Sequence, residues 1–442
     1  MLSSDGRVSE RKTFASAKGC WRARQRVAVL RRTPLLAAGG ALLGVLSGAP
    51  AFAQQPEAPE RAQQAEVPER AQEAPRPKPQ PEARQGLRIE PSLTTVYDGN
   101  VYRVDSRTED PVADVIVTPA IEIGYDRDIG IAAFSLRALA GYDRFISETQ
   151  RSKPRLELEG SGKYVIAGQC WVRPSASYRQ QRADYGDINS ASENLQKFST
   201  LGVAADCERP AGLYPVVAWQ RDTTRNGDGF EYADQTSNLY RAGIGYSRPS
   251  LGKLTAYYEH VTSERPQLAV ENRSDAYGLS FSRSVSPLTS IDADVRWMHV
   301  TSTAAAVGSY NGPGWDVSVS TMAIPRVKIT GSTERTIVND SLIATGFAVR
   351  TAWRLSADLA LSELTTVGVF GELVRRDFRQ DATIRPFSYT HDRTNQFGLI
   401  ARRKITEALA LDLSVTHLDR ATNSDVSNYR ANRVSLGATM RF

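Results

Sequence analysis

The chain has 442 residues, with 55 Lys and Arg against 49 Asp and Glu, and a formal net charge of +6. An excess of basic residues often indicates nucleic-acid binding. Residues 1–53 alone, however, carry a net charge of +7, which leaves a net charge of −1 for the rest of the chain. Beyond residue 53 no stretch approaches 18 consecutive apolar residues, so the sequence excludes membrane-spanning helices there. We therefore expect no nucleic-acid partner.

Residues 1–53 have the three parts of a secretory signal peptide. A basic region ends at Arg31 and Arg32, an uncharged run rich in Leu, Ala and Gly covers residues 35–46, and residues 51–53 read Ala-Phe-Ala. Small residues in this spacing are the pattern that a signal peptidase cleaves. The apolar run is too short to cross about 30 Å of hydrocarbon. We predict a signal peptide over residues 1–53, cleaved after Ala53.

Residues 54–85 form a low-complexity segment rich in Pro, Glu, Gln and Ala. It contains no aromatic residue and one β-branched residue, Val67, so it cannot bury enough apolar surface to fold. Its prolines favour extended, semi-rigid spacing. We predict a disordered periplasmic linker. It could be an inert spacer, or it could dock to a periplasmic partner and give the protein a structural, tethering role.

From residue 86 to the end, segments of about ten to fourteen residues alternate apolar with small or polar residues, as in transmembrane strands. In residues 132–142, one face carries Ala, Phe, Leu, Ala, Ala and Tyr. The same arrangement recurs in residues 240–246, 277–282 and 409–415. A period of two predicts strands with one apolar and one polar side.

The connections between these strands fall into two alternating length classes. Short turns are predicted at residues 126–130, 208–212, 250–253 and 286–290, and longer polar loops at 98–111, 185–193, 227–235, 266–274 and 379–393. This alternation is typical of outer-membrane barrels. We predict an all-β fold over residues 86–442: a transmembrane antiparallel up-and-down barrel of about 18 strands, or 16 because the pattern is weakest over residues 315–364. Its partner is then the lipid of the outer membrane of a Gram-negative bacterium.

The last strand ends in a pattern that resembles the outer-membrane assembly signal. A polar residue, a glycine, a hydrophobic residue and a terminal aromatic follow in the expected order, as Ser435, Gly437, Met440 and Phe442. An exposed edge strand with this ending can pair with the assembly machinery before the barrel closes. The pattern implies the barrel assembly machinery as a partner.

Cys170 and Cys207 lie at opposite ends of one predicted hairpin. Their midpoint falls inside the predicted loop at residues 185–193, so the pairing register brings them together at the periplasmic rim. A disulfide is geometrically plausible in an oxidising compartment; two free thiols are the alternative. Two cysteines without neighbouring histidines do not make a zinc site.

The remaining polar residues indicate a lumen rather than a catalytic centre. The four histidines are scattered, His417 near Asp412 or Asp419 suits the rim, and no hydrolase elbow, phosphate loop or dinucleotide motif is present. We predict no enzyme, metal or cofactor. Both signs mix on the polar face, so strong ion selectivity is not implied. The sequence is compatible with a general or solute-selective diffusion porin and also with a barrel whose interior is plugged. The candidate lumen residues are Glu122, Arg137, Arg241, Asp292, Asp294, Arg296 and Asp412.

One stretch near the start of the barrel carries a family resemblance. Residues 98–105 read Asp-Gly-Asn-Val-Tyr-Arg-Val-Asp, and a strand containing Pro119 follows at residues 114–121. This resembles the β-barrel porin family associated with exopolysaccharide biosynthesis loci. The resemblance implies an outer-membrane barrel that supports export or surface assembly of an exopolysaccharide, with polysaccharide export components as partners. The residues that carry it in the loop are Asp98, Asn100, Tyr102, Arg103 and Asp105.

Overall fold

The computed structural model describes residues 86–183, 194–207, 209–304, 307–339, 346–379, 390–423 and 428–442. The predicted signal peptide and linker, the predicted loop at 185–193 and most of the loop at 379–393 lie outside these ranges. Within them, no helix has the length and apolarity needed to cross a membrane.

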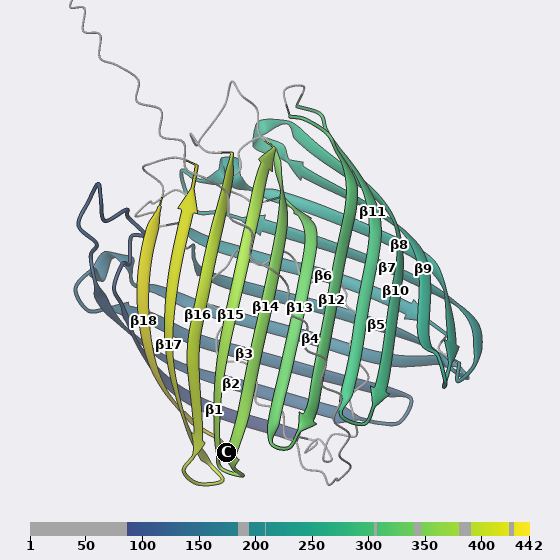
Figure 1. The fold of residues 1–442 in the computed structure, drawn as a ribbon, viewed down its shortest axis with the longest axis horizontal. Coiled ribbons are helices and arrows are strands. Elements are labelled where there is room, and N and C mark those ends of the chain that lie inside the picture. The colour runs from purple at the N-terminus through teal and green to yellow at the C-terminus, as the bar shows by residue number, and fades with distance from the viewer. Residues whose placement is uncertain are drawn as a thin grey trace, which may run out of the picture. The chain divides into compact units, whose positions relative to one another are not determined.

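The described residues form eighteen strands and three short 3-10 helices (Figure 1). The strands are β1 (Gly86–Asp98), β2 (Asp114–Asp128), β3 (Ala132–Phe145), β4 (Lys153–Ala167), β5 (Cys170–Arg182), β6 (Leu195–Asp206), β7 (Gly212–Arg225), β8 (Gln235–Arg248), β9 (Gly252–Arg265), β10 (Val270–Ser286), β11 (Thr289–Ser302), β12 (Tyr310–Ile324), β13 (Val327–Val338), β14 (Phe347–Ser362), β15 (Thr365–Arg379), β16 (His391–Lys404), β17 (Leu409–Thr422) and β18 (Tyr429–Met440). The helices are η1 (Thr149–Arg151), η2 (Glu231–Ala233) and η3 (Pro266–Leu268).

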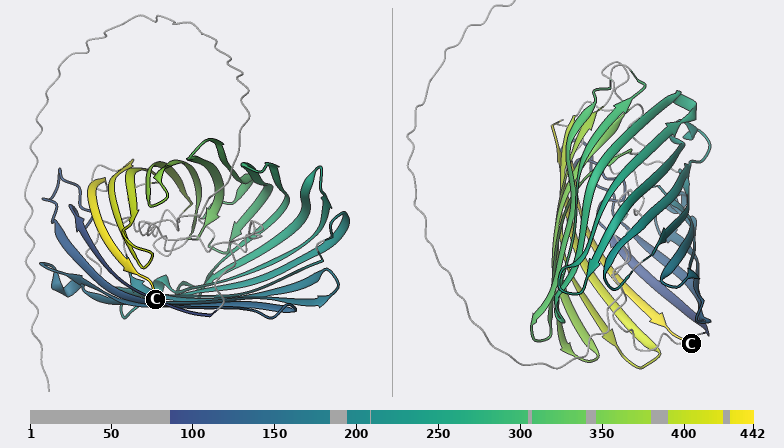
Figure 2. Two further views of the ribbon diagram at one scale, coloured as in Figure 1. Left: turned by 90° about the horizontal axis from the view of Figure 1, so that it is seen from below. Right: turned by 90° about the vertical axis from the view of Figure 1, so that its right-hand side faces the viewer.

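The sheet closes on itself into a barrel (Figure 2). Each strand pairs antiparallel with the next, and β1 pairs with β18 from Ser92↔Thr439 to Asp98↔Arg433. Beyond β18, the Phe442 amide donates a hydrogen bond of 3.0 Å to the Ile89 carbonyl and extends this seam. The closed antiparallel barrel and its eighteen strands are therefore confirmed. The weak pattern over residues 315–364 had left a total of sixteen strands possible. The structure places β13 and β14 in this region.

The two ends of the barrel differ in the length of their connections. One end, here called the turn end, holds Gly86, the start of β1, and the short turns at residues 129–131, 168–169, 249–251 and 287–288. The other, the loop end, holds the longer connections, among them residues 99–113 and 226–234. The loop predicted at 266–274 is shorter than expected, because only residues 266–269 connect β9 to β10. Residues 270–274 are the start of β10 and already pair with β9.

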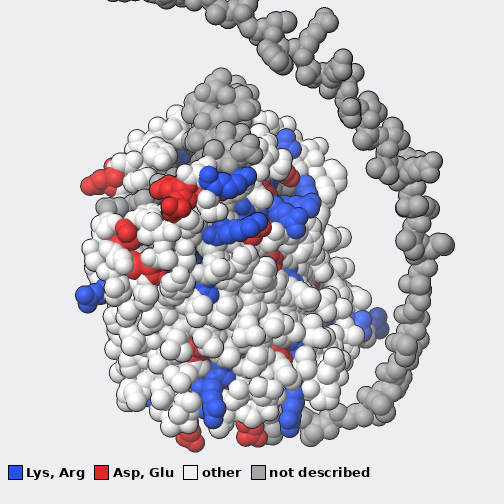
Figure 3. All heavy atoms as spheres, turned by 60° about the vertical axis from the view of Figure 1, so that its left-hand side comes forward, with Lys and Arg blue, Asp and Glu red and all other residues white. Residues whose placement is uncertain are grey.

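Apolar side chains cover the outside of the barrel, and mostly polar side chains line its inside. Large apolar residues remain exposed on strands around the barrel, including Leu136, Ile244, Tyr277, Leu355 and Leu436. Figure 3 shows one face of the barrel, with charged side chains gathered mainly toward the two ends and a mostly uncharged band between them. An apolar outer band over a polar interior is the pattern of barrels that span a lipid bilayer, where every backbone group must be paired internally.

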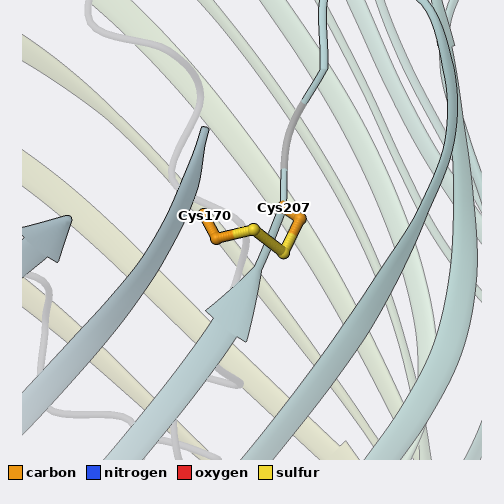
Figure 4. Close-up of a disulfide and its surroundings, with 2 residues drawn as sticks. All are labelled: Cys170 and Cys207. Carbon is orange, nitrogen blue, oxygen red and sulfur yellow. A yellow bond between two sulfur atoms is a disulfide. The ribbon is translucent and has the colours of Figure 1, made fainter. Parts of the chain in front are cut away.

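A disulfide joins Cys170 and Cys207 at the turn end (Figure 4). Cys170 is the first residue of β5, and Cys207 directly follows β6. The two cysteines are 37 residues apart in sequence. The bond therefore fastens the hairpin of β5 and β6 at the ends opposite its connecting loop.

We expect the Cys170→Ser/Cys207→Ser double variant to lose about 2–4 kcal/mol of unfolding free energy, because the open chain gains entropy when unfolded. Denaturant unfolding of detergent-solubilised protein measures the loss. The wild type should fall to the same stability when a reductant is added, whereas the double variant should not respond to it. Equal unfolding midpoints for oxidised and reduced wild type would contradict the expectation.

Candidate functional site

The candidate lumen residues lie on inward strand faces, but the fold distributes them around the wall. Alternation places Glu122 inward, because its neighbours Ile121 and Ile123 are exposed on the outside. Arg137 lies on β3, Arg241 on β8, Asp292, Asp294 and Arg296 on β11, and Asp412 on β17. The structure therefore offers a lined wall rather than one compact site.

Several charges on this wall pair with a charge of opposite sign on a neighbouring strand. Arg137 Nη2 donates to Glu122 Oε2 over 2.8 Å. Arg402 Nε lies 3.4 Å from Asp412 Oδ1. The same lateral pairing joins Arg88 with Asp126, Arg173 with Asp206 and Arg441 with Glu90. In each of these pairs a positive group lies beside a negative group, so the two charges largely offset each other's field.

A dense polar cluster lies about halfway along the wall on β8, β9 and β11. Tyr257 donates to both oxygens of Asp294, at 2.8 and 2.6 Å. Arg296 Nη1 donates to Asp294 over 2.9 Å, and Arg241 Nε donates to Glu259 over 3.0 Å. The Arg241 guanidinium also lies 4.4 Å from the centre of the Tyr257 ring. Charge-assisted hydrogen bonds of this kind hold side chains in fixed positions.

Gly278 on β10 makes this cluster possible. A Cβ added at position 278 would lie 2.4 Å from Tyr257 Cζ, so the tyrosine ring lies directly over the glycine. From there it reaches across β10 to Asp294 on β11. Covering a strand glycine with an aromatic ring from the adjacent strand also stabilises strand pairing.

Further inward ion pairs on β13–β17 complete the wall. Arg350 pairs with Glu334 and lies 3.6 Å from Glu372, to which Arg354 donates over 2.9 Å. Near the loop end, Asp392 is buried and accepts hydrogen bonds from Arg376 and Arg420. Tyr257, Glu372 and Asp392 were not among the lumen residues predicted from the sequence. Glu372 could have been assigned to the inner face by counting every second residue from the exposed apolar positions. Asp392 could not, because it fell within the loop predicted at 379–393.

The loop residues of the family resemblance form a clamp at the seam of the barrel. Asp98, the last residue of β1, is almost fully buried. It accepts two hydrogen bonds from the Arg103 guanidinium, at 2.9 and 2.8 Å, and one from Arg433 of β18, at 2.7 Å. We call Asp98, Arg103 and Arg433 the seam clamp. It ties the first long loop to the strand that closes the barrel.

Asn100 shapes the backbone of this loop. Its side-chain amide donates to the carbonyls of Val104 and Arg430, at 2.8 and 3.0 Å, and its side-chain oxygen accepts from the Val104 amide at 3.0 Å. Arg103 has a φ of 57°, which is uncommon for a residue other than glycine. This left-handed conformation is held by the hydrogen bonds between Arg103 and Asp98.

Tyr102 and Asp105 complete the loop. The Tyr102 hydroxyl donates to Glu148, and the Arg151 guanidinium lies 4.5 Å from the centre of the Tyr102 ring, so the first loop contacts the second. Burial, together with the bond to Glu148, raises the pKa of Tyr102. Hydrogen bonds from Arg107 lower the pKa of Asp105. These residues all make contacts within the protein, which supports a structural role for the motif.

The residues of the assembly pattern lie on or beside the seam. Ser435 and Gly437 face inward on β18, since Val434 and Leu436 are exposed on the outside. Met440 is exposed on the outer face, and Phe442, beyond the strand, is 71% exposed. The terminal aromatic is therefore accessible at the turn end.

Within the described ranges the histidines belong to no metal site. No group of three or more His, Cys, Asp and Glu side chains is placed to hold a metal ion in that part of the chain. His417 Nδ1 lies 2.6 Å from the side-chain oxygen of Asn432. Asp412 and Asp419 pair instead with Arg402 and Arg430.

No family model matches the chain. No curated protein matches it by sequence. Among solved structures, the chain is similar to a BenF-like porin from Pseudomonas fluorescens Pf-5, with a TM-score of 0.45 and 11% identity over 80% of this chain and 99% of the other. It is also similar to Pseudomonas aeruginosa OccK11 (OpdR), with a TM-score of 0.44 and 12% identity over 81% and 98%. A third is the siderophore receptor PirA from Acinetobacter baumannii, with a TM-score of 0.42 and 9% identity over 81% of each chain.

Proposed function

We propose that the chain is an outer-membrane diffusion porin that admits small polar solutes. The observation that carries this is the inner wall, where a closed barrel of eighteen strands is lined by laterally paired charges. Barrels of 16–18 strands are wide enough to leave an aqueous channel. Because the wall charges are balanced, the channel should pass uncharged hydroxyl-rich solutes as readily as ions of either sign.

Liposome swelling tests the proposal. Vesicles containing the purified protein should swell in isotonic solutions of small neutral sugars, with rates that fall as the sugar becomes larger. Empty vesicles and vesicles with heat-denatured protein are the controls. Protein-containing vesicles that swell no faster than the empty ones would indicate a plugged interior and would rule out the porin.

The second candidate is support of exopolysaccharide export or surface assembly, with polysaccharide export components as partners. It rests on the resemblance over residues 98–121. Deleting the gene should then reduce or mislocalise the secreted polysaccharide, and the wild-type gene supplied in trans should restore it. Unchanged polysaccharide together with lost solute uptake would favour the diffusion porin.

The linker at residues 54–85 supports a third, tethering role in the periplasm. If it docks there, affinity capture of the full chain should recover a periplasmic protein that is lost when residues 54–85 are deleted. A barrel that assembles normally and captures the same proteins without the linker would leave residues 54–85 as a spacer.

Recognition by the barrel assembly machinery is proposed for the C-terminal strand. We expect deletion of Phe442 to lower the amount of folded barrel in the membrane severalfold, because the exposed edge strand then lacks its terminal aromatic. Heat-modifiable gel migration of membrane fractions measures this amount. Leu436→Ala, which trims an exposed residue of the same strand, is the matched control and should assemble normally. Equal folded amounts for the deletion and the wild type would contradict the proposal.

A further inference from the structure

A groove of about 550 Å³ crosses the outer face of β1, β2 and β3 near the loop end. Its apolar lining comes from Leu93, Val117, Pro119 and Tyr142, together with the buried Phe145. Leu93 and Tyr142 are about half exposed on the outside of the barrel. The groove therefore opens toward the surroundings of the apolar band, not toward the lumen.

An interruption of strand pairing accompanies the groove. Between β2 and β3 the register runs to Val117↔Arg144 and resumes at Ala120↔Gly141, with no paired residues between. Pro119 has no backbone N–H to donate, which confines proline to irregular positions in a sheet. Thr118 instead donates its hydroxyl to Asp143 over 2.8 Å on the inner side. This side-chain hydrogen bond therefore joins β2 and β3 where their backbone pairing is interrupted.

Arg144 supplies the one cation among the groove-lining residues. It is exposed and is the second-last residue of β3, so it lies at the loop end of the groove. In the ranges that the structure describes, the Arg144 guanidinium makes no hydrogen bond or ion pair with another residue, in contrast to the paired arginines of the inner wall. An exposed arginine above apolar residues suits the polar headgroup region of a bilayer.

We propose that this groove binds an acyl chain of a phosphate-bearing lipid from the membrane leaflet at the loop end, with the phosphate on Arg144. The position of the groove indicates an acyl chain as its occupant, because the lipid-facing surface of a barrel is in contact with acyl chains. Charge supports the same occupant, since the unpaired guanidinium matches an anionic headgroup. Thr149 of η1 adds a hydroxyl to the same lining.

Native mass spectrometry of the full chain with added lipid A tests the proposal. Arg144→Gln should weaken lipid A retention about fivefold, as expected for one interfacial cation, and Leu93→Trp should abolish it by filling the groove. Arg127→Gln, an exposed outward position at the turn end, and Leu436→Trp, an exposed position on β18, are the matched controls and should bind as the wild type does.

The headgroup and the occupant are tested separately. Lipid A without phosphates should bind the wild type about as weakly as intact lipid A binds Arg144→Gln. Equal retention of lipid A by all variants would overturn the proposal. So would binding of phosphate-free lipid A to the wild type as strongly as intact lipid A. If the protein forms a dimer that Leu93→Trp dissociates while lipid A still binds, the groove is occupied by a second copy of the chain. That result would also overturn the proposal. Arg144→Gln changes only an exposed side chain, so the test holds even if Leu93→Trp fails to fold.

Discussion

The Asp98→Ala variant is expected to lose about 3–5 kcal/mol of unfolding free energy, because removing one partner of a buried ion pair leaves its charge uncompensated. Asp98 is the acceptor of the seam clamp, and without it Arg103 and Arg433 both lose their carboxylate partner. Arg103, whose backbone is left-handed, also loses both side-chain hydrogen bonds to Asp98. Denaturant unfolding in detergent, followed by circular dichroism, measures the change.

The control for this prediction is Asp419→Ala. Asp419 also pairs with an arginine, but that arginine, Arg430, has a side chain that is 77% exposed. Exposed pairs contribute about 0.2–1 kcal/mol, so the control should lose far less stability. If the two variants unfold at the same denaturant concentration, the seam clamp does not stabilise the closed barrel.

Gly278→Ala should lower the unfolding free energy by about 1–3 kcal/mol, as overpacking of a well-packed site does. The new methyl group would occupy the space of the Tyr257 ring. Tyr257 would have to move, and its hydrogen bonds to Asp294 and its contact with Arg241 would be lost. Gly371→Ala on β15 is the matched control, since a Cβ there meets no atom within 4 Å.

A double-mutant cycle separates this contact from a general effect of the new side chain. With Tyr257→Ala already present, adding Gly278→Ala should cost little, because the ring that it displaces is gone. Residues in contact show such non-additivity, whereas independent sites add. Additive losses would show that Tyr257 does not account for the requirement for glycine at 278.

Features that depend on neighbours along the chain could be predicted from the sequence. Period-two alternation and connection length indicated the barrel and its strand number, because both are local consequences of a sheet with one apolar face. The Cys170–Cys207 pairing followed from the symmetry of a single hairpin. The error at residues 266–274 has the same origin, because a strand that extends beyond the apolar band has polar residues on both faces.

The contacts that define the wall and the seam could not be predicted in this way. Asp98 meets Arg433 across a separation of 335 residues, and that pairing depends on the register at which the last strand closes on the first. Tyr257 and Gly278 are neighbours only because β9 and β10 pair as Tyr257↔Gly278. The family resemblance did identify Asp98 and Arg103, but only their contacts reveal the clamp.

Conductance across a planar lipid bilayer tests most directly whether the balanced wall encloses a channel. The purified protein should give stable conductance steps, with a reversal potential near zero in a KCl gradient. The Glu122→Gln/Glu159→Gln variant removes two carboxylates that pair with Arg137 and should shift the selectivity toward chloride. A protein that inserts into the bilayer without conductance steps, or a wild type that strongly selects one ion, would contradict a balanced, open wall.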